Sequence, residues 1–370
     1  MHTSQIKVLQ ILPDLNEGGV ERGVVELNRE FISRGLISHI ISNGGQLTKK
    51  ISADRGFHHK LDVSTKNPFT FLIRVLQLKQ LIREIKPDII HVRSRYPAWI
   101  TWFANKDFNI PLVTTVHGMN SISKYSQIMT KGDKVICVSE VIQKYVLDAY
   151  KFDATKSVVI QRGVDMHLFD TKSISKIFTQ EFIDQFGLDN RFIITSVGRI
   201  SWIKDYETFI KAIALCRKQI PNLTGLIVGG ARKDKLNYLE SLKQLAANEG
   251  VADCIHFTGS QHNVTEIYAL SNIVVNSTIK MGNIGRTIIE ALAMNTPVIA
   301  TSYEGLNNVI NNGINGYLVK TQDVNELSER ILLLHKKNIQ ETRSSIPHCF
   351  TLEHMVDSTI KVYKECLCLT

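Results

Sequence analysis

Short apolar segments alternate with longer amphipathic segments along almost the whole chain, and this alternation restricts the fold more than any other feature. The apolar segments have the length of buried strands, and the segments between them show helical periodicity. Expected strands cover residues 8–12, 39–42, 89–92, 112–116, 135–138, 158–160, 192–197, 225–228, 255–257, 273–276, 298–300 and 317–319. Expected helices cover residues 21–34, 69–85, 140–150, 206–219, 237–249, 265–270, 286–294 and 324–335. The order strand, helix, strand predicts parallel pairing, so we expect an α/β protein with two doubly wound sheets.

The boundary between the two halves is expected near residue 165. A strand ends there at Arg162-Gly163-Val164-Asp165, and a polar stretch over 171–180 follows. Glycine and polar residues between two periodic segments are typical of a connecting loop. We therefore expect one domain over residues 1–168, a second over 169–350, and a last helix at 351–367.

The composition indicates a globular protein with an uneven charge. The chain has 370 residues, 44% hydrophobic and 21% charged, with a net charge of +9 that lies almost wholly in residues 1–168. Such a basic half is either a solvated surface or one that attracts an anionic membrane or an anionic acceptor. A nucleic-acid partner is not expected, because the sequence lacks interleaved aromatic and basic platforms.

The cysteines and the N-terminus bear on the compartment. The six cysteines are scattered without a Cys-x-x-Cys pair, which favours a reducing compartment and argues against a zinc site. The first residues lack the apolar core of a signal peptide, and no apolar run reaches about 18 residues. We expect a cytoplasmic protein, at most peripheral at the inner face of a membrane.

Two segments of the second half carry the clearest chemistry. Arg199 and Lys204 follow an apolar strand, and Gly285 opens a helix that contains Glu290. Two cations and a free helix N-terminus suit a diphosphate, and a carboxylate further along the helix suits sugar hydroxyls or a structural arginine. No Asp-x-Asp occurs, so a carboxylate-bound metal has no obvious site. Together the segments favour a sugar-nucleotide site.

The first half offers weaker candidates, each with a structural alternative. Gly18 and Gly19 permit close approach to a ligand, but also suit any tight strand-to-helix turn. His117 ends a strand beside a glycine, where it either reaches a cleft or has no role. Residues 93–99 follow a strand and are interpreted as a loop on the acceptor side, or only as a structural loop. The basic helix at 67–86 is either a packed helix or a membrane-docking face.

Taken together and in this order, these segments resemble the retaining GT-B glycosyltransferases of sequence family 4, and the likeness spans nearly the whole chain. The matching segments are residues 18–23, 117–118, 162–165, 198–204, 285–287 and 290–294, and residues 93–99 look like a loop of bacterial surface-polysaccharide members. The resemblance implies two Rossmann-like domains facing across a cleft. Residues 1–168 would bind the acceptor and 169–350 the donor, with the C-terminal helix, within 351–370, crossing back to the first domain.

The resemblance also implies roles for single residues. Arg199 and Lys204 match diphosphate ligands that act in catalysis, and Glu290 matches the carboxylate that binds the ribose. His117 matches a catalytic histidine near the transferred sugar. Gly18 and Gly19 match the loop over the donor phosphates.

Further donor contacts are implied for Gly285, Arg286 and Thr287, which open the second helix. On the acceptor side the implied residues are Arg22, Arg93, Arg95 and Trp99. No metal ligand and no cofactor is implied, because the nucleotide-sugar is itself a substrate.

The activity implied is metal-independent transfer of a sugar, expected to be a hexose, from a nucleotide-sugar to a glycan or lipid-linked acceptor. The configuration would be retained, and the pathway would be lipopolysaccharide or surface-polysaccharide synthesis. Family members often carry a glutamate eight residues before Glu290, where this chain has Gly282. That departure leaves open a catalytically impaired nucleotide-sugar-binding subunit. A GT-B-fold epimerase or an inverting transferase is the other alternative.

Overall fold

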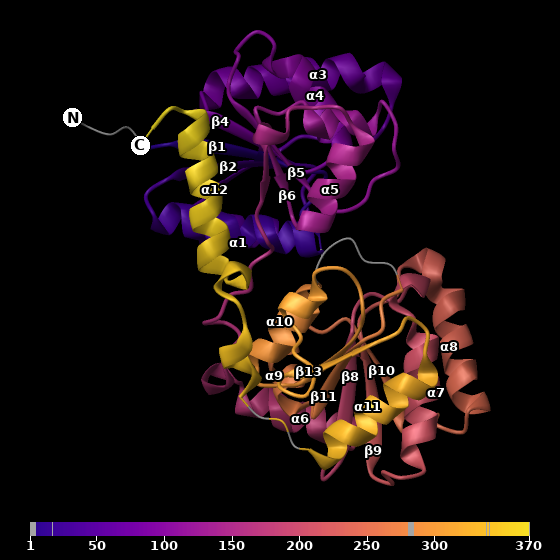
Figure 1. The fold of residues 1–370 in the computed structure, drawn as a ribbon. Coiled ribbons are helices and arrows are strands. Elements are labelled where there is room, and N and C mark those ends of the chain that lie inside the picture. The colour runs from indigo at the N-terminus through magenta and orange to yellow at the C-terminus, as the bar shows by residue number, and fades with distance from the viewer. Residues whose placement is uncertain (1–4, 17, 280–284, 338, 340, 370) are drawn as a thin grey trace. The chain divides into compact units, whose positions relative to one another are not determined.

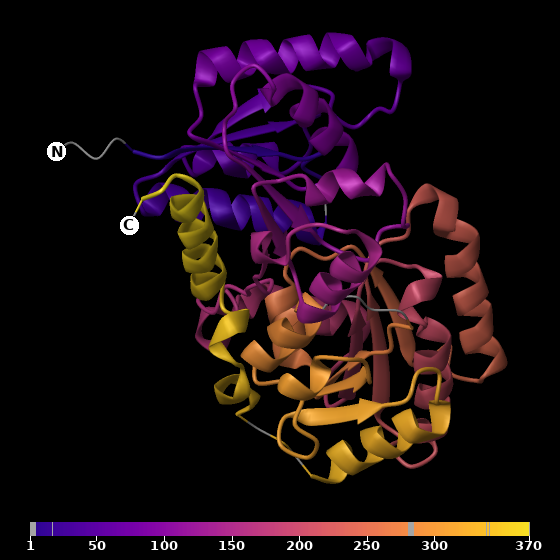
Figure 2. The ribbon, with the colours of Figure 1, turned by 45° about the horizontal axis from the view of Figure 1, so that its top comes forward.

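The computed structural model describes residues 5–16, 18–279, 285–337, 339 and 341–369, and its chain divides into two compact units (Figure 1). Unit 1 consists of Met1–Gly163 and Leu352–Thr370, and unit 2 of Val164–Thr351. In each unit a parallel sheet lies between two layers of helices, which Figure 2 shows from a second direction.

Unit 1 contains a seven-stranded parallel sheet in the order β3-β2-β1-β4-β5-β6-β7. Its strands are β1 (Lys7–Ile11), β2 (Ile37–Ser42), β3 (Phe57–Lys60), β4 (Ile89–Val92), β5 (Leu112–Val116), β6 (Lys134–Cys137) and β7 (Ser157–Val159). Its helices are α1 (Gly19–Ser33), α2 (Thr48–Ala53), α3 (Pro68–Ile85), α4 (Arg95–Asn105), α5 (Glu140–Ala149) and α12 (Leu352–Cys366).

Alternate residues of each unit 1 strand point to opposite helical layers. Leu9 and Ile90 pack with α3, α4 and α5, whereas Val8 and Ile89 pack with α1 and α12. By the same alternation His91 faces the α1 and α12 layer. The last helix of the chain thus completes the core of the first unit.

Unit 2 contains a six-stranded parallel sheet in the order β10-β9-β8-β11-β12-β13. Its strands are β8 (Phe192–Val197), β9 (Leu223–Val228), β10 (Ile255–Gly259), β11 (Ile273–Asn276), β12 (Val298–Thr301) and β13 (Gly316–Val319). Its helices are α6 (Lys176–Phe186), α7 (Tyr206–Arg217), α8 (Leu236–Asn248), α9 (Val264–Leu270), α10 (Arg286–Ala293) and α11 (Val324–Lys336). One core packs α7, α8 and α11 on the sheet, and two further clusters pack α6, α9 and α10.

The prediction of two doubly wound parallel sheets is confirmed, with corrections to single elements. Residues 93–99 do not form a loop, because α4 begins at Arg95 with Ser94 as its N-cap residue. Pro97 is compatible with this helix because it lies in the first turn, where a missing N–H breaks no helical bond. Strand β3 was not expected, since Phe57-His58-His59-Lys60 lacks an apolar run.

Across the described parts of the chain, every helix is too short or too polar to cross a membrane.

Candidate functional site

Lys204 lies beyond the carboxyl end of β8, in a short 3₁₀ helix (η4, Trp202–Lys204). Its Nζ donates a hydrogen bond to Thr278 Oγ1 at 3.3 Å. The backbone around it is fixed from the end of β11, because Ser277 Oγ donates to the carbonyl oxygens of Lys204 and Asp205 at 2.8 and 3.0 Å. Lys204 is therefore anchored through both its side chain and its main chain.

Two glycines leave room for this arrangement. A Cβ on Gly198 would lie 2.8 Å from Cε of Lys204, so the lysine side chain passes directly over this residue. Gly229 has φ +153°, and a Cβ there would overlap the carbonyl of Gly198. The side chain of Lys204 thus packs on a backbone that only glycine permits.

The charge of Lys204 is only weakly compensated within unit 2. Burial lowers the pKa of Lys204, and the nearby Arg199 lowers it further. Among the described residues the Arg199 guanidinium, which is exposed, has neither a hydrogen-bond nor an ion-pair partner. An anion bound between Lys204 and Arg199 would stabilise the charged lysine and offset the repulsion between the two cations.

A relay of hydrogen bonds joins Lys204 to the first turn of α10. Thr278 Oγ1 donates to Asn276 Oδ1 at 2.7 Å, and Asn276 Nδ2 donates to Thr287 Oγ1 at 3.0 Å. Gly285 is the N-cap residue of α10, and no described side chain caps the helix there. The two segments singled out in the sequence are thus brought together through Asn276 and Thr278. Neither residue was predicted from the sequence, although both belong to the polar run Asn276-Ser277-Thr278 that begins at the last residue of β11.

Glu290 is buried on α10 and already has partners. Its Oε2 accepts a hydrogen bond from the Tyr268 hydroxyl at 3.0 Å, and its Oε1 lies 3.4 Å from Nε of Arg286. The side chains of Arg286 and Glu290 are 9% and 6% exposed. Of the two partners expected from the sequence, a structural arginine is present here, and a ligand hydroxyl would have to compete with it. Gly282 lies outside the described residues.

The strand-to-helix turn of unit 1 is closed by an arginine. Arg162 donates from Nη2 to the carbonyl oxygen of Gly19, and a Cβ on Gly19 would meet the same guanidinium. The Glu21 carboxylate lies over Gly18, where a Cβ would collide with it. Arg22 follows in the first turn of α1, with its N–H bonded to the carbonyl of Gly18.

His117 contributes two unpaired ring nitrogens to a small cavity in unit 1. Although the residue is partly exposed, both nitrogens are shielded from solvent and bond to no described residue. Burial holds the pKa of His117 well below its usual range, and Arg162 and Arg93 add to this effect. This lowering favours the neutral form of the ring, in which each nitrogen can bond a hydroxyl group. The cavity has a volume of about 30 Å³. Its lining residues are Gly19, Val20, Gly23, Leu27, His91, Arg93, Thr115, His117, Ile136, Val138, Ile160, Arg162, Met355 and Thr359.

Arg93 is buried beside the same cavity. Its Nη2 donates to Gln10 Oε1 at 2.8 Å, while its Nε has no partner among the described residues. His91 bonds the Tyr363 hydroxyl through Nδ1 and Thr115 Oγ1 through Nε2, both at 2.6 Å. Arg93 therefore lies in the core under α12 and not on a surface loop, contrary to the interpretation of residues 93–99.

Arg95 and Trp99 lie on α4 and contact the segment before β6. Arg95 Nη1 donates to Ser126 Oγ at 3.0 Å, and Trp99 Nε1 donates to the carbonyl of Tyr125 at 3.0 Å. Both side chains thus make structural contacts in this structure. Within the part of the chain that is described, no three His, Cys, Asp or Glu side chains group as metal ligands would.

Comparison with known proteins gives two matches that divide the chain. Residues 17–168 match the family described as Glycosyltransferase Family 4, and residues 178–346 match Glycosyl transferases group 1. A glycosyltransferase structure from Rickettsia africae ESF-5 is 31% identical, with a TM-score of 0.88, and the match covers 98% of this chain and 99% of that one.

Two further comparisons are more distant. The structure of Anabaena Alr3699/HepE in complex with UDP and glucose has a TM-score of 0.85 at 20% identity, over 98% of this chain and 100% of that one. The D-inositol 3-phosphate glycosyltransferase of Mycolicibacterium smegmatis is 24% identical over 76% of this chain and 68% of its own length. The matches to four relatives of that name span 54–68% of the relatives.

Proposed function

Because this chain belongs to the glycosyltransferases of the GT-B fold, we propose that it transfers a hexose from a nucleotide-sugar to a glycan or lipid-linked acceptor with retention of configuration. The observation that carries the proposal is the relay from Lys204 through Thr278 and Asn276 to Thr287. It links a cation to the first turn of a helix whose N-terminus is capped by no described side chain, which is an arrangement that suits a diphosphate.

In this proposal Arg199 and Lys204 bind the donor diphosphate and stabilise the charge that grows as the nucleotide leaves. The exposed Arg199 has no described partner to give up, and Lys204 is held in place by the end of β11. A fixed cation such as Lys204 stabilises a transition state without rearranging during the reaction. The N–H groups of the first turn of α10, after Gly285, add a partial positive charge.

Glu290 would bind the nucleotide ribose through the carboxylate oxygens that now face Tyr268 and Arg286. A carboxylate accepts from two hydroxyl groups at once, which suits a vicinal diol. On this proposal Arg286 orients Glu290 and does not bind the diphosphate itself.

The neutral His117 and the turn at Gly18 and Gly19 are proposed to act on the transferred sugar and the donor phosphates. A neutral ring with two free nitrogens can bond a sugar hydroxyl without adding positive charge where an oxocarbenium-like state forms. The departing phosphate oxygen would accept the acceptor proton, which is compatible with retention.

The acceptor, the pathway and the location are inferred from sequence. The likeness of residues 93–99 to surface-polysaccharide members supports lipopolysaccharide or a similar glycan as the product, and Arg22 and Arg95 remain candidates near the acceptor. We propose reaction without a metal, in the cytoplasm or at the inner face of a membrane.

Calorimetry with UDP-, GDP- and ADP-sugars in a chelating buffer tests the donor site. Arg199→Ala should weaken donor binding by about tenfold to a hundredfold, the size of one lost hydrogen bond to a charged group. The matched control is Arg191→Ala, because Arg191 is also exposed but directly precedes the first residue of β8. This variant should bind the donor as the wild type does. Equal donor affinity in the two variants would remove Arg199 from the site.

The anomer of the product tests the reaction. Retention predicts that donor and product share one anomeric configuration, which NMR coupling constants report. An inverted product would indicate an inverting transferase, and a changed donor without transfer would indicate an epimerase. Donor binding without turnover across a panel of acceptors would favour the impaired subunit.

A further inference from the structure

Helix α3 is apolar on two opposite sides, and only one of them packs on the protein. Val75, Leu78, Ile82 and Ile85 are buried in the core of unit 1. At 100° per residue these positions cluster on one side of the helix. The opposite side should be polar in a helix that faces water.

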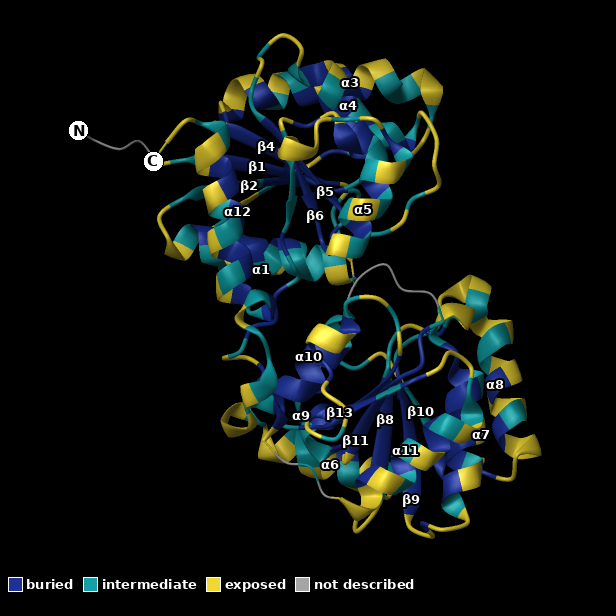
Figure 3. Cartoon of the chain, in the orientation of Figure 1, coloured by how far each residue is buried: buried dark blue, intermediate teal, exposed yellow. Residues whose placement is uncertain are grey.

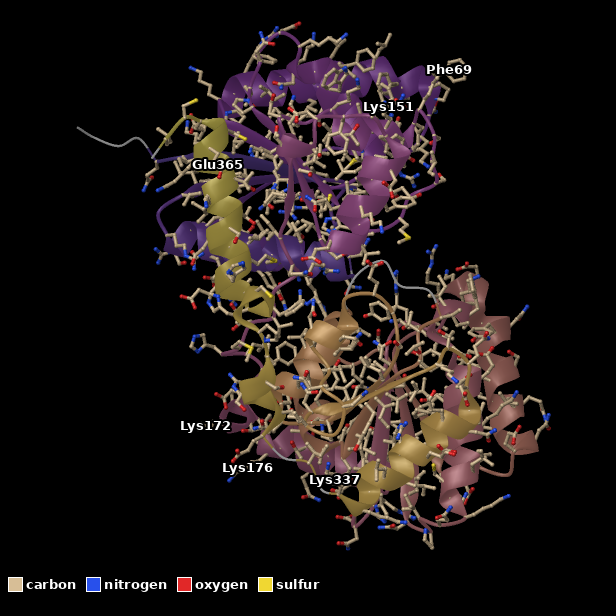
Figure 4. All side chains as sticks on the ribbon, in the orientation of Figure 1. Phe69, Lys151, Lys172, Lys176, Lys337 and Glu365 are labelled. Atoms are coloured by element: carbon tan, nitrogen blue, oxygen red, sulfur yellow. The ribbon has the colours of Figure 1, made fainter. Side chains whose placement is uncertain are left out.

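The outer side of α3 instead carries four exposed apolar side chains. Phe69, Leu72, Ile73 and Leu76 are 91%, 69%, 55% and 64% exposed, and their spacing of three, one and three residues makes one continuous stripe. Figure 3 shows exposed positions recurring along α3, and Figure 4 shows Phe69 at its end. We call these four residues the α3 stripe. Apolar patches of this kind mark interaction sites.

The charged groups around the α3 stripe are mostly basic. Lys66 precedes the helix, Arg83 continues the stripe two turns after Leu76, and Lys86 ends the helix; all three are exposed. Lys106 lies nearby in unit 1, with its Nζ 4.9 Å from the ring centre of Phe103, which itself packs on Phe71 of α3.

The acids near α3 are largely neutralised. Asp62 pairs with Arg74 at 2.7 Å, and Asp107 pairs with Lys79 at 2.6 Å. Glu84 is the only acidic residue of α3 itself. The surroundings of the stripe thus keep an excess of positive charge.

We propose that the α3 stripe and its basic flank bind the surface of an anionic membrane, with α3 lying in the plane of the interface. Phenylalanine and leucine on one side of a helix with lysine and arginine beside them suit insertion at the boundary of head groups and acyl chains. Anionic lipids complement Lys66, Arg83, Lys86 and Lys106. The inference does not depend on sugar transfer, since it rests on the α3 stripe and its basic flank.

A second copy of the chain fits this surface less well. A twofold axis with antiparallel helices would place the charged end of each α3, with Arg83 and Lys86, on the apolar half of the other. Parallel helices would instead place Arg83 and Lys86 of one chain beside the same two cations of the other chain, where like charges repel. Four side chains on two helical turns also offer far less than the ~800 Å² per partner of a stable interface.

Sedimentation with phosphatidylcholine vesicles, with and without phosphatidylglycerol, tests the proposal. The wild type should bind the anionic vesicles, and Leu72→Gln with Leu76→Gln should weaken this binding by about tenfold or more, given the area removed. Ile177→Gln, which removes a 75% exposed isoleucine of α6, is the matched control and should bind as the wild type does. Lys66→Gln with Arg83→Gln should reduce the preference for phosphatidylglycerol.

Three results of the vesicle experiment would overturn the inference. The wild type fails to bind anionic vesicles, the paired leucine substitutions leave binding unchanged, or Ile177→Gln weakens it equally. Light scattering distinguishes a membrane from a second copy of the chain as the occupant of the α3 stripe. If the wild type is a dimer and the leucine substitutions dissociate it, the stripe binds a second copy. Donor calorimetry on the same variants should match the wild type, so a failure here is distinguishable from a failure of the proposed function.

Discussion

Replacing Lys204 by methionine should weaken donor binding and stabilise the free protein at the same time. The lysine is partly buried and lies near Arg199, and both features lower the pKa of Lys204. A lowered lysine pKa means that the folded protein disfavours the charged form relative to the unfolded chain. Methionine keeps the length of the side chain over Gly198 and removes the charge. A lysine with a purely structural role would instead lower stability when it is replaced.

The magnitudes of the two effects come from the contacts. Loss of one charged hydrogen bond to the diphosphate costs about 1.5–3 kcal/mol, which is a dissociation constant larger by about tenfold to 150-fold. In the free protein the one side-chain hydrogen bond to a described residue that the substitution loses is the 3.3 Å bond to Thr278. Each kcal/mol gained should raise Tm by about 2–4 °C in a domain of this size.

Calorimetric donor titration and thermal unfolding measure the two effects, with Lys211→Met, on the exposed side of α7, as the control. Between the lowered pKa of Lys204 and 10.5, the unfolded chain binds more protons, so the stability of the wild type should rise with pH in that window. The Lys204→Met variant should lack that part of the rise. A lower Tm in Lys204→Met with unchanged donor affinity would refute the assignment.

Two further predictions concern single hydrogen-bonded pairs. Tyr268→Phe removes the donor 3.0 Å from buried Glu290 and should lower the free energy of unfolding by about 1–3 kcal/mol; an unchanged urea midpoint would contradict this. In unit 1, burial and the neighbouring His59 lower the pKa of His39 from 6.5 to about 4, so the unfolded chain takes up the proton first and stability is lost as pH falls through this window. His39→Gln should flatten that loss in urea titrations between neutral and acidic pH, and an equally steep loss would remove His39 as its cause.

Strands that are buried on both faces were the easiest elements to predict. The bounds expected for β4, β5, β8 and β11 agree with the structure, because each is a short segment rich in β-branched residues. Strand β3 at the sheet edge is only half-buried and carries two histidines, so its sequence lacks that pattern. Helix α4 begins with two polar residues and a proline, which resembles a loop until the first turn is allowed for.

The candidate site shows a similar limit. Sequence spacing singled out Lys204 and Glu290, but not the residues that hold them, because those contacts cross 74 residues to Thr278 and 22 to Tyr268. Arg93 is a different case. It follows His91 by two residues and therefore lies on the same side of the strand, which could have predicted its burial.

The return of α12 to unit 1 sets the order in which the chain can fold during its synthesis. Leu352, Val356 and Tyr363 close one face of a sheet whose strands were all made before residue 164. At ~5–20 residues per second, the ribosome needs on the order of ten to forty seconds to make the intervening unit. The nascent first unit must therefore keep an unfinished apolar surface during that time, because α1 but not α12 can cover Val8 and Ile89. The contiguous second unit is able to fold as soon as it emerges. Chaperone dependence in the cell should thus be greatest for the part of the protein that is translated first.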